Sequence, residues 1–250
     1  MRSLSLTGYV CLMAASQAVA AISAVGEPAG LTIRLYDSAG VGERELRQAA
    51  EEAVWIFRKA NLSVAWVQCE LNVKDLPAGS PCRETPNSFG VGLLNQAPGF
   101  LSKGALGFAL ISSGPLRHSG VVYPRVAELA RSDAKRVQTY QVLAYAIAHE
   151  VAHLILGSTA HGPSGILRKE YAPAELQAMS QRRLLFSSRE AAEMRRRLAE
   201  WSHADAARQW SPVDAGSIAT RFGRLGTSGL MLSKRAARDF LPHGQSLFSN

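Results

Sequence analysis

The residues best suited to chemistry lie in one segment, HEVAHLILGSTAH, which holds three of the six histidines of the chain. His149 and His153 are four residues apart in a strongly helical stretch, so they lie one turn apart on one face. Two imidazoles in that arrangement can bind one metal ion. Glu150 cannot easily join the same ligand set, but it can reach a water molecule on an open position. Burying these polar groups in an apolar helix is costly unless they are satisfied, and a metal satisfies all three. The alternative is a histidine network in the core.

The HExxH pattern is typical of zinc hydrolases, in which Zn²⁺ acidifies a water molecule and the glutamate takes its proton. A third ligand must come from another segment. Gly157 can end the helix and let the chain turn back, which favours His161. A later carboxylate, Glu170 or Glu175, is the alternative. The other histidines lack partners at metal-binding spacing, and we expect them on the surface: His118, His203 and His243.

The helix that must carry the pattern is Thr139–Leu156, which is apolar nearly all round and is therefore expected to be buried. Ser187 and Glu190 form a capping-box pair that starts a last helix, with apolar residues on one face as far as Trp201. A further helix is expected over residues 46–60, and residues 72–88 form a loop. Short apolar or alternating segments predict five strands: 31–36, 62–67, 89–94, 106–111 and 120–123.

Residues 1–20 have the features of a secretory signal peptide: Arg2, a short apolar run, and the small residues Ala18 and Ala20 at a cleavage site. The alternative is a short N-terminal membrane anchor. No second stretch is long and apolar enough to span a bilayer, so we expect no transmembrane anchor after cleavage. The predicted location is secreted or periplasmic. Residues 30–201 form the predicted catalytic domain, and residues 202–250 form a basic, loosely ordered extension with a short helix near 233–240.

The chain has 250 residues, of which 47% are hydrophobic and 19% charged, and this composition excludes a wholly disordered protein. Its net charge of +8 would suit nucleic-acid binding. However, residues 182–250 contain 12 Lys and Arg against 6 Asp and Glu, so the remainder of the mature chain is nearly neutral. We therefore expect no specific nucleic-acid partner.

Two cysteines, Cys69 and Cys82, remain after removal of the leader, which itself contains Cys11. An even number of cysteines in an exported chain predicts a disulfide. Closing a loop of this size stabilises the fold by about 3 kcal/mol in the chain-entropy model. Two free thiols or a metal site are the alternatives.

The segment resembles the metzincin signature HExxHxxGxxH, although here the glycine comes one residue later and the third histidine two residues later. Metzincins also have a methionine turn below the metal. Residues 161–167 resemble that turn, with Leu167 in place of the methionine. The longer string HEVAHLILGSTAHGPSGIL is similar to exported bacterial proteins carrying HExxHLLLG, a histidine four residues on, and then Gly-Ile-Met. The resemblance is specific over roughly residues 143–170, and residues 202–250 lie outside it.

The resemblance implies an α+β zincin-like fold: a twisted, five-stranded mixed sheet with the HExxH helix beneath a cleft. It also implies that the strand near 106–111 is the antiparallel edge, which can bind an extended peptide by strand addition.

The leading interpretation is an exported zinc endopeptidase acting on peptides or proteins, with Glu150 as general base. His149, His153 and His161 are its zinc ligands. The second is a non-catalytic zincin-fold binding module of the cell envelope, favoured by the altered spacing and by Leu167. A third, compatible with either, takes the basic C-terminal region as an adhesion segment for anionic envelope polymers.

Overall fold

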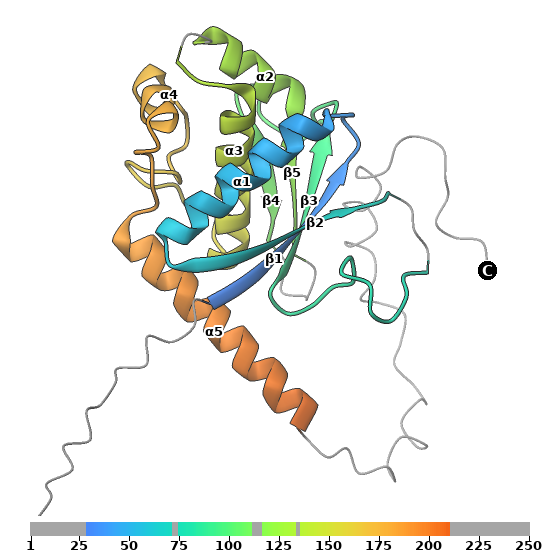
Figure 1. Cartoon of the computed structure of the whole chain (residues 1–250). Coiled ribbons are helices and arrows are strands. Elements are labelled where there is room, and N and C mark those ends of the chain that lie inside the picture. The colour runs from blue at the N-terminus through green and yellow to red at the C-terminus, as the bar shows by residue number, and fades with distance from the viewer. Residues whose placement is uncertain (1–28, 72–74, 112–116, 134–135, 211–250) are drawn as a thin grey trace, which may run out of the picture.

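The protein is described here by a computed structural model, which covers residues 29–71, 75–111, 117–133 and 136–210. Five strands form one sheet in the order β2-β1-β3-β5-β4 (Figure 1). The strands are β1 (Ala29–Asp37), β2 (Leu62–Cys69), β3 (Ser88–Leu94), β4 (Gly107–Leu110) and β5 (His118–Val122). The three pairs β2–β1, β1–β3 and β3–β5 are parallel, and β4 is an antiparallel edge strand. The expected α+β architecture, with five strands in a mixed sheet and an antiparallel edge near 106–111, is therefore confirmed.

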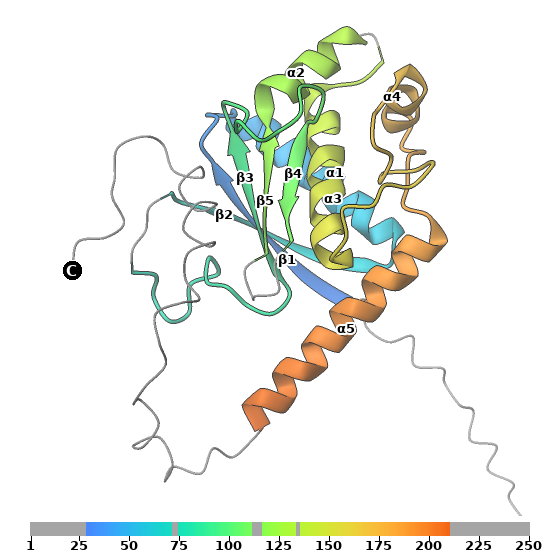
Figure 2. The ribbon, with the colours of Figure 1, turned by 180° about the vertical axis from the view of Figure 1, so that it is seen from behind.

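Two helices, α1 (Glu43–Lys59) and α3 (Thr139–Leu156), cover one face of the sheet, as the front and back views show (Figures 1 and 2). Leu31, Ile33 and Leu35 of β1 are buried and belong to the core beneath these helices. α3 has the predicted bounds and is buried almost all round. It ends at Gly157, whose positive φ of 55° gives the left-handed cap expected there.

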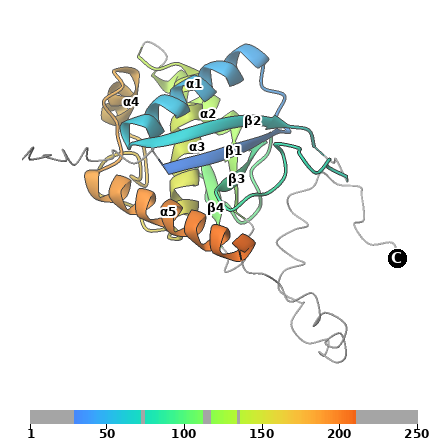
Figure 3. The ribbon, with the colours of Figure 1, turned by 60° about the horizontal axis from the view of Figure 1, so that its bottom comes forward.

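Three further helices surround this core: α2 (Tyr123–Ser132), α4 (Pro173–Ser180) and α5 (Ser188–Trp210). α5 runs past the ends of β1 and α3, as the view from below shows (Figure 3). The predicted capping pair starts it, since Ser187 and Glu190 exchange side-chain-to-backbone hydrogen bonds of 2.7 and 3.2 Å. The helix continues to Trp210 rather than ending near Trp201. None of the described helices is both long enough and apolar enough to cross a membrane.

The sequence interpretation missed α2 and α4, and it placed Tyr123 in a strand although that residue starts α2. Both helices carry a proline in the first turn, Pro124 and Pro173, where its fixed φ and missing N–H suit a helix start. The signal peptide, most of the C-terminal extension with its helix near 233–240, and His243 lie outside the described residues.

A disulfide joins Cys69 at the end of β2 to Cys82, as predicted from their even number. Cys82 and Glu84, at the end of the loop that it closes, contact Arg34 of β1, which is 3% exposed. The Arg34 guanidinium donates hydrogen bonds of 3.2 Å to the Cys82 carbonyl and to Glu84. His118 lies half-buried beside the same carboxylate, at 3.5 Å, and so is not the surface residue that we expected. The chain around Cys82 is therefore attached to the sheet by both a disulfide and an ion pair.

Candidate metal centre

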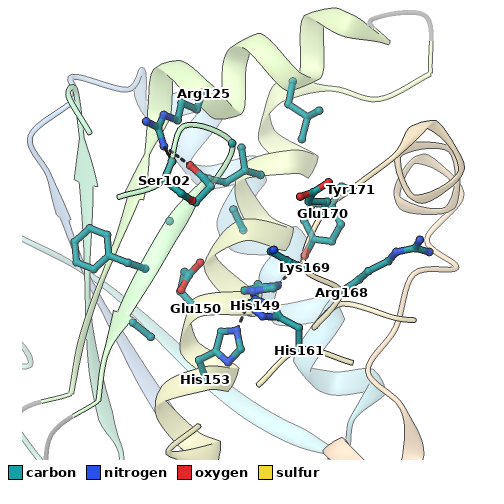
Figure 4. A pocket seen from close by; sticks show the side chains of 18 of the residues that line it. Ser102, Arg125, His149, Glu150, His153, His161, Arg168, Lys169, Glu170 and Tyr171 are labelled. Carbon is teal, nitrogen blue, oxygen red and sulfur yellow. Dashed lines mark hydrogen bonds between the residues drawn. The ribbon is translucent and has the colours of Figure 1, made fainter. Parts of the chain in front are cut away.

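Three histidines converge on one point at the end of α3 (Figure 4). His149 and His153 project from consecutive turns of the helix, and His161 returns from the loop that follows Gly157. One ligand nitrogen from each lies within 4.8 Å of the others. The described part of the chain contains no other group of three such side chains at this spacing. The set predicted from the sequence is therefore assembled by the fold.

The outer nitrogens of the two helical histidines are held by backbone carbonyls. His149 Nδ1 lies 2.8 Å from the Ile166 oxygen, and His153 Nδ1 lies 2.6 Å from the Ser158 oxygen. Each Nδ1 must carry the proton to make these contacts, so each Nε2 presents a lone pair. Hydrogen bonds of this kind fix the tautomer and the ring orientation of metal-binding histidines.

The two Nε2 atoms face each other at 2.9 Å. Two neutral imidazoles have two ring protons in total. The His149–His153 pair makes three close contacts, and each of these contacts requires a proton. A cation bound by both nitrogens removes this deficit, so the donor set fits a metal ion. Burial, then the charge of His153, lowers the pKa of His149 to about 4, and both rings are therefore neutral near pH 7. The neutral form is the one that binds metal.

The alternative third ligands, Glu170 and Glu175, lie outside the histidine group. One oxygen of Glu175 accepts a 2.6 Å hydrogen bond from Arg168, and the other accepts one of 3.0 Å from the Ala172 N–H at the start of α4. Glu175 is thus a helix cap in an ion pair. Glu170 lines the cleft wall without joining the set. Of the three candidates, only His161 is close to the helical pair.

Glu150 lies beside the histidines and is 6% exposed. Among the described residues it has no hydrogen-bond partner, and burial raises the pKa of its carboxyl to about 8. β4 passes so near that a Cβ on Gly107 would lie 2.9 Å from Glu150 Oε1. Glycine at the start of β4 therefore leaves room for the carboxyl. A carboxyl with no internal partner at the edge of a cleft is suited to exchange protons with a bound molecule.

The loop after His161 forms a tight turn that supports His149. The Gly162 N–H donates a 2.9 Å hydrogen bond to the Leu167 carbonyl. Gly165 has a φ of 79°, and a Cβ there would lie 2.7 Å from the Leu185 carbonyl oxygen, so glycine is required. Leu167, which stands where the resemblance places methionine, is buried in the core at 2% exposure.

Tyr171 is a site residue that the sequence interpretation missed. Its hydroxyl donates a 2.7 Å hydrogen bond to the Ile166 carbonyl and lies 3.3 Å from His149 Nδ1. It therefore holds in place the Ile166 carbonyl, which orients the His149 ring. No spacing rule in the sequence connects Tyr171 with the histidines, because the contact depends on the path of the intervening turn.

A cleft of about 870 Å³ opens above the histidines. One wall is β4 with the loop before it, and residues 168–171 form another. Arg125 on α2 holds the loop by donating hydrogen bonds to the carbonyls of Ser102 (2.7 Å) and Ala105 (2.6 Å). The residues of β4 and the three histidines therefore line one cavity.

No family model and no curated protein matches the chain. Solved structures that are similar to it at low identity include the following two. One is archaemetzincin from Methanopyrus kandleri, which is 16% identical with a TM-score of 0.45, over 70% of this chain and 99% of that one. The other is metalloproteinase-II from Bacteroides fragilis, at 12% identity and a TM-score of 0.41, over 68% of this chain and 53% of that one.

Proposed function

We propose that this protein is a zinc-dependent endopeptidase with Glu150 as its general base. One observation carries the proposal: three histidines and an unpartnered, buried carboxyl meet in a cleft bounded by a free strand edge. A set of three neutral imidazoles is typical of catalytic zinc sites, which keep one position open. Bound zinc would acidify a water molecule and polarise the scissile carbonyl.

The residues of the chain account for the remaining requirements. Among the described strands, β4 pairs only with β5, so its other edge can hydrogen-bond to an extended peptide along the cleft. Glu150 lies next to Gly107 at the start of that strand, where it can take a proton from water and give it to the leaving amine. Tyr171 and the Ile166 carbonyl keep His149 in place during this exchange.

We also propose that the protein acts outside the cytoplasm. The leader-like residues 1–20 and the Cys69–Cys82 disulfide support this proposal, since disulfides persist mainly in oxidising compartments. The substrate is then a peptide or protein of the envelope or the surroundings. Adhesion of the basic C-terminal region to anionic polymers is compatible with the same location.

The test combines metal analysis with a peptide-library cleavage assay on the mature protein. We expect one zinc per chain, lost in His149→Ala and weakened in His161→Ala. Glu150→Gln should retain zinc but lose activity by about 10²–10⁴-fold, as is typical when a general base is removed. Glu170→Gln, a matched change in the same cleft, should stay close to wild type. A folded, zinc-loaded wild type that cleaves no peptide would instead support the non-catalytic binding module.

A further inference from the structure

The walls of the cleft carry four cationic side chains, and their charges are not equally compensated. Arg168 pairs with the buried Glu175 at 2.6 Å. Arg125 is engaged with backbone carbonyls of the loop before β4. Lys103 and Lys169 have no carboxylate within ion-pairing distance among the described residues. The cleft therefore keeps uncompensated positive charge, to which a bound metal ion would add.

Lys169 is the cation that lies at the histidines. Figure 4 shows its side chain directed into the cleft beside His149, on the side away from β4. Lys169 and the three histidines line the same cleft. The carboxylate of the next residue, Glu170, lies away from the histidines in the same view. A cation in this position can contact a substrate side chain that lies next to the scissile bond.

An extended peptide on the edge of β4 directs alternate side chains to opposite sides. A side chain next to the scissile bond that projects from the sheet face on which the histidines lie would enter the space beside Lys169. A carboxylate there gains an ion pair, whereas a lysine or arginine meets repulsion from both Lys169 and the metal. An aspartate or glutamate thus has an advantage at that position.

We propose that Lys169 makes the enzyme selective for acidic peptides, by binding an Asp or Glu side chain of the substrate close to the scissile bond. The inference rests on the proposed function, because the peptide must bind along β4 with its reacting bond at the histidines. Lys169 remains accessible to water, so the pair should contribute like an exposed ion pair. The expected preference is about fivefold for a carboxylate over its uncharged amide.

The experiment uses matched peptides that differ only by Glu, Gln or Lys at each of three positions on either side of the cleaved bond. In wild type, one position should show a kcat/KM ratio of about five in favour of Glu. Lys169→Ala should bring that ratio to one, and Lys169→Glu should shift the preference to a Lys-containing peptide. Lys59→Ala, which removes the same charge on the distant α1, should leave the ratio unchanged.

Binding to the zinc-loaded Glu150→Gln protein supplies a second readout that needs no turnover. The Glu peptide should bind about fivefold more tightly than the Gln peptide, and Lys169→Ala should abolish the difference. Equal affinities, or a ratio that Lys59→Ala changes as much as Lys169→Ala does, would overturn the inference. Absence of cleavage with a retained Glu preference would overturn only the proposed peptidase activity.

Discussion

Glu150→Gln should stabilise the metal-free protein at neutral and alkaline pH. The reason is the burial of an unpartnered carboxyl, which raises its pKa from 4.5 to about 8. Such a group favours the fold only while protonated. Its contribution is therefore fully present below pH 4.5 and is lost as the pH rises toward 8. Glutamine keeps the shape of the side chain and has no proton to lose.

The size of the effect follows from the pKa difference between the folded and unfolded chains. One pKa unit corresponds to about 1.4 kcal/mol. At pH 7 the unfolded chain ionises Glu150 while the fold keeps it protonated, so the metal-free fold loses about 3 kcal/mol of stability relative to pH 4.5. For a domain of this size, that free energy corresponds to about 6–12 °C in Tm. The lowered pKa values of the histidines affect wild type and variant alike, so they cancel in the difference.

Urea unfolding of both proteins between pH 4.5 and 8.5, with a chelator present, measures this quantity. The difference in unfolding free energy should be small at pH 4.5 and grow steadily up to pH 8. Addition of zinc should reduce it, because a nearby cation favours the ionised carboxylate. A difference that is independent of pH would refute the reasoning, since it would mean that Glu150 is solvated or paired in the metal-free fold.

Three further predictions test the surroundings of the site. Tyr171→Phe should weaken zinc affinity by about tenfold in a chelator competition, because the variant loses the hydroxyl that braces the Ile166 carbonyl. Thiol labelling of the denatured, unreduced protein should find neither Cys69 nor Cys82, and replacing both with serine should cost about 3 kcal/mol in urea unfolding. Arg182→Ala should cost about 2 kcal/mol in the same assay, because it leaves the buried Glu52 carboxylate without its partner.

The sequence alone determined the elements whose signals are local. The bounds of α3 agree with prediction because one apolar run ends at a glycine that can adopt a positive φ. The HExxH spacing places His149, Glu150 and His153 on that helix whatever surrounds it, since four residues make about one helical turn. The Ser187–Glu190 capping pair acts within a single turn of α5 and was visible for the same reason.

Only the tertiary structure shows that His161, and neither carboxylate, joins the two helical histidines, because this depends on how the chain from Gly157 to Leu185 folds over α3. In the same packing, Glu175 caps the start of α4, and the Tyr171 hydroxyl donates a hydrogen bond to the Ile166 carbonyl. Lys169 differs from any other surface lysine only through its place beside the histidines. Each of these contacts depends on how a turn packs against a helix. No periodicity or residue spacing in the sequence predicts that packing.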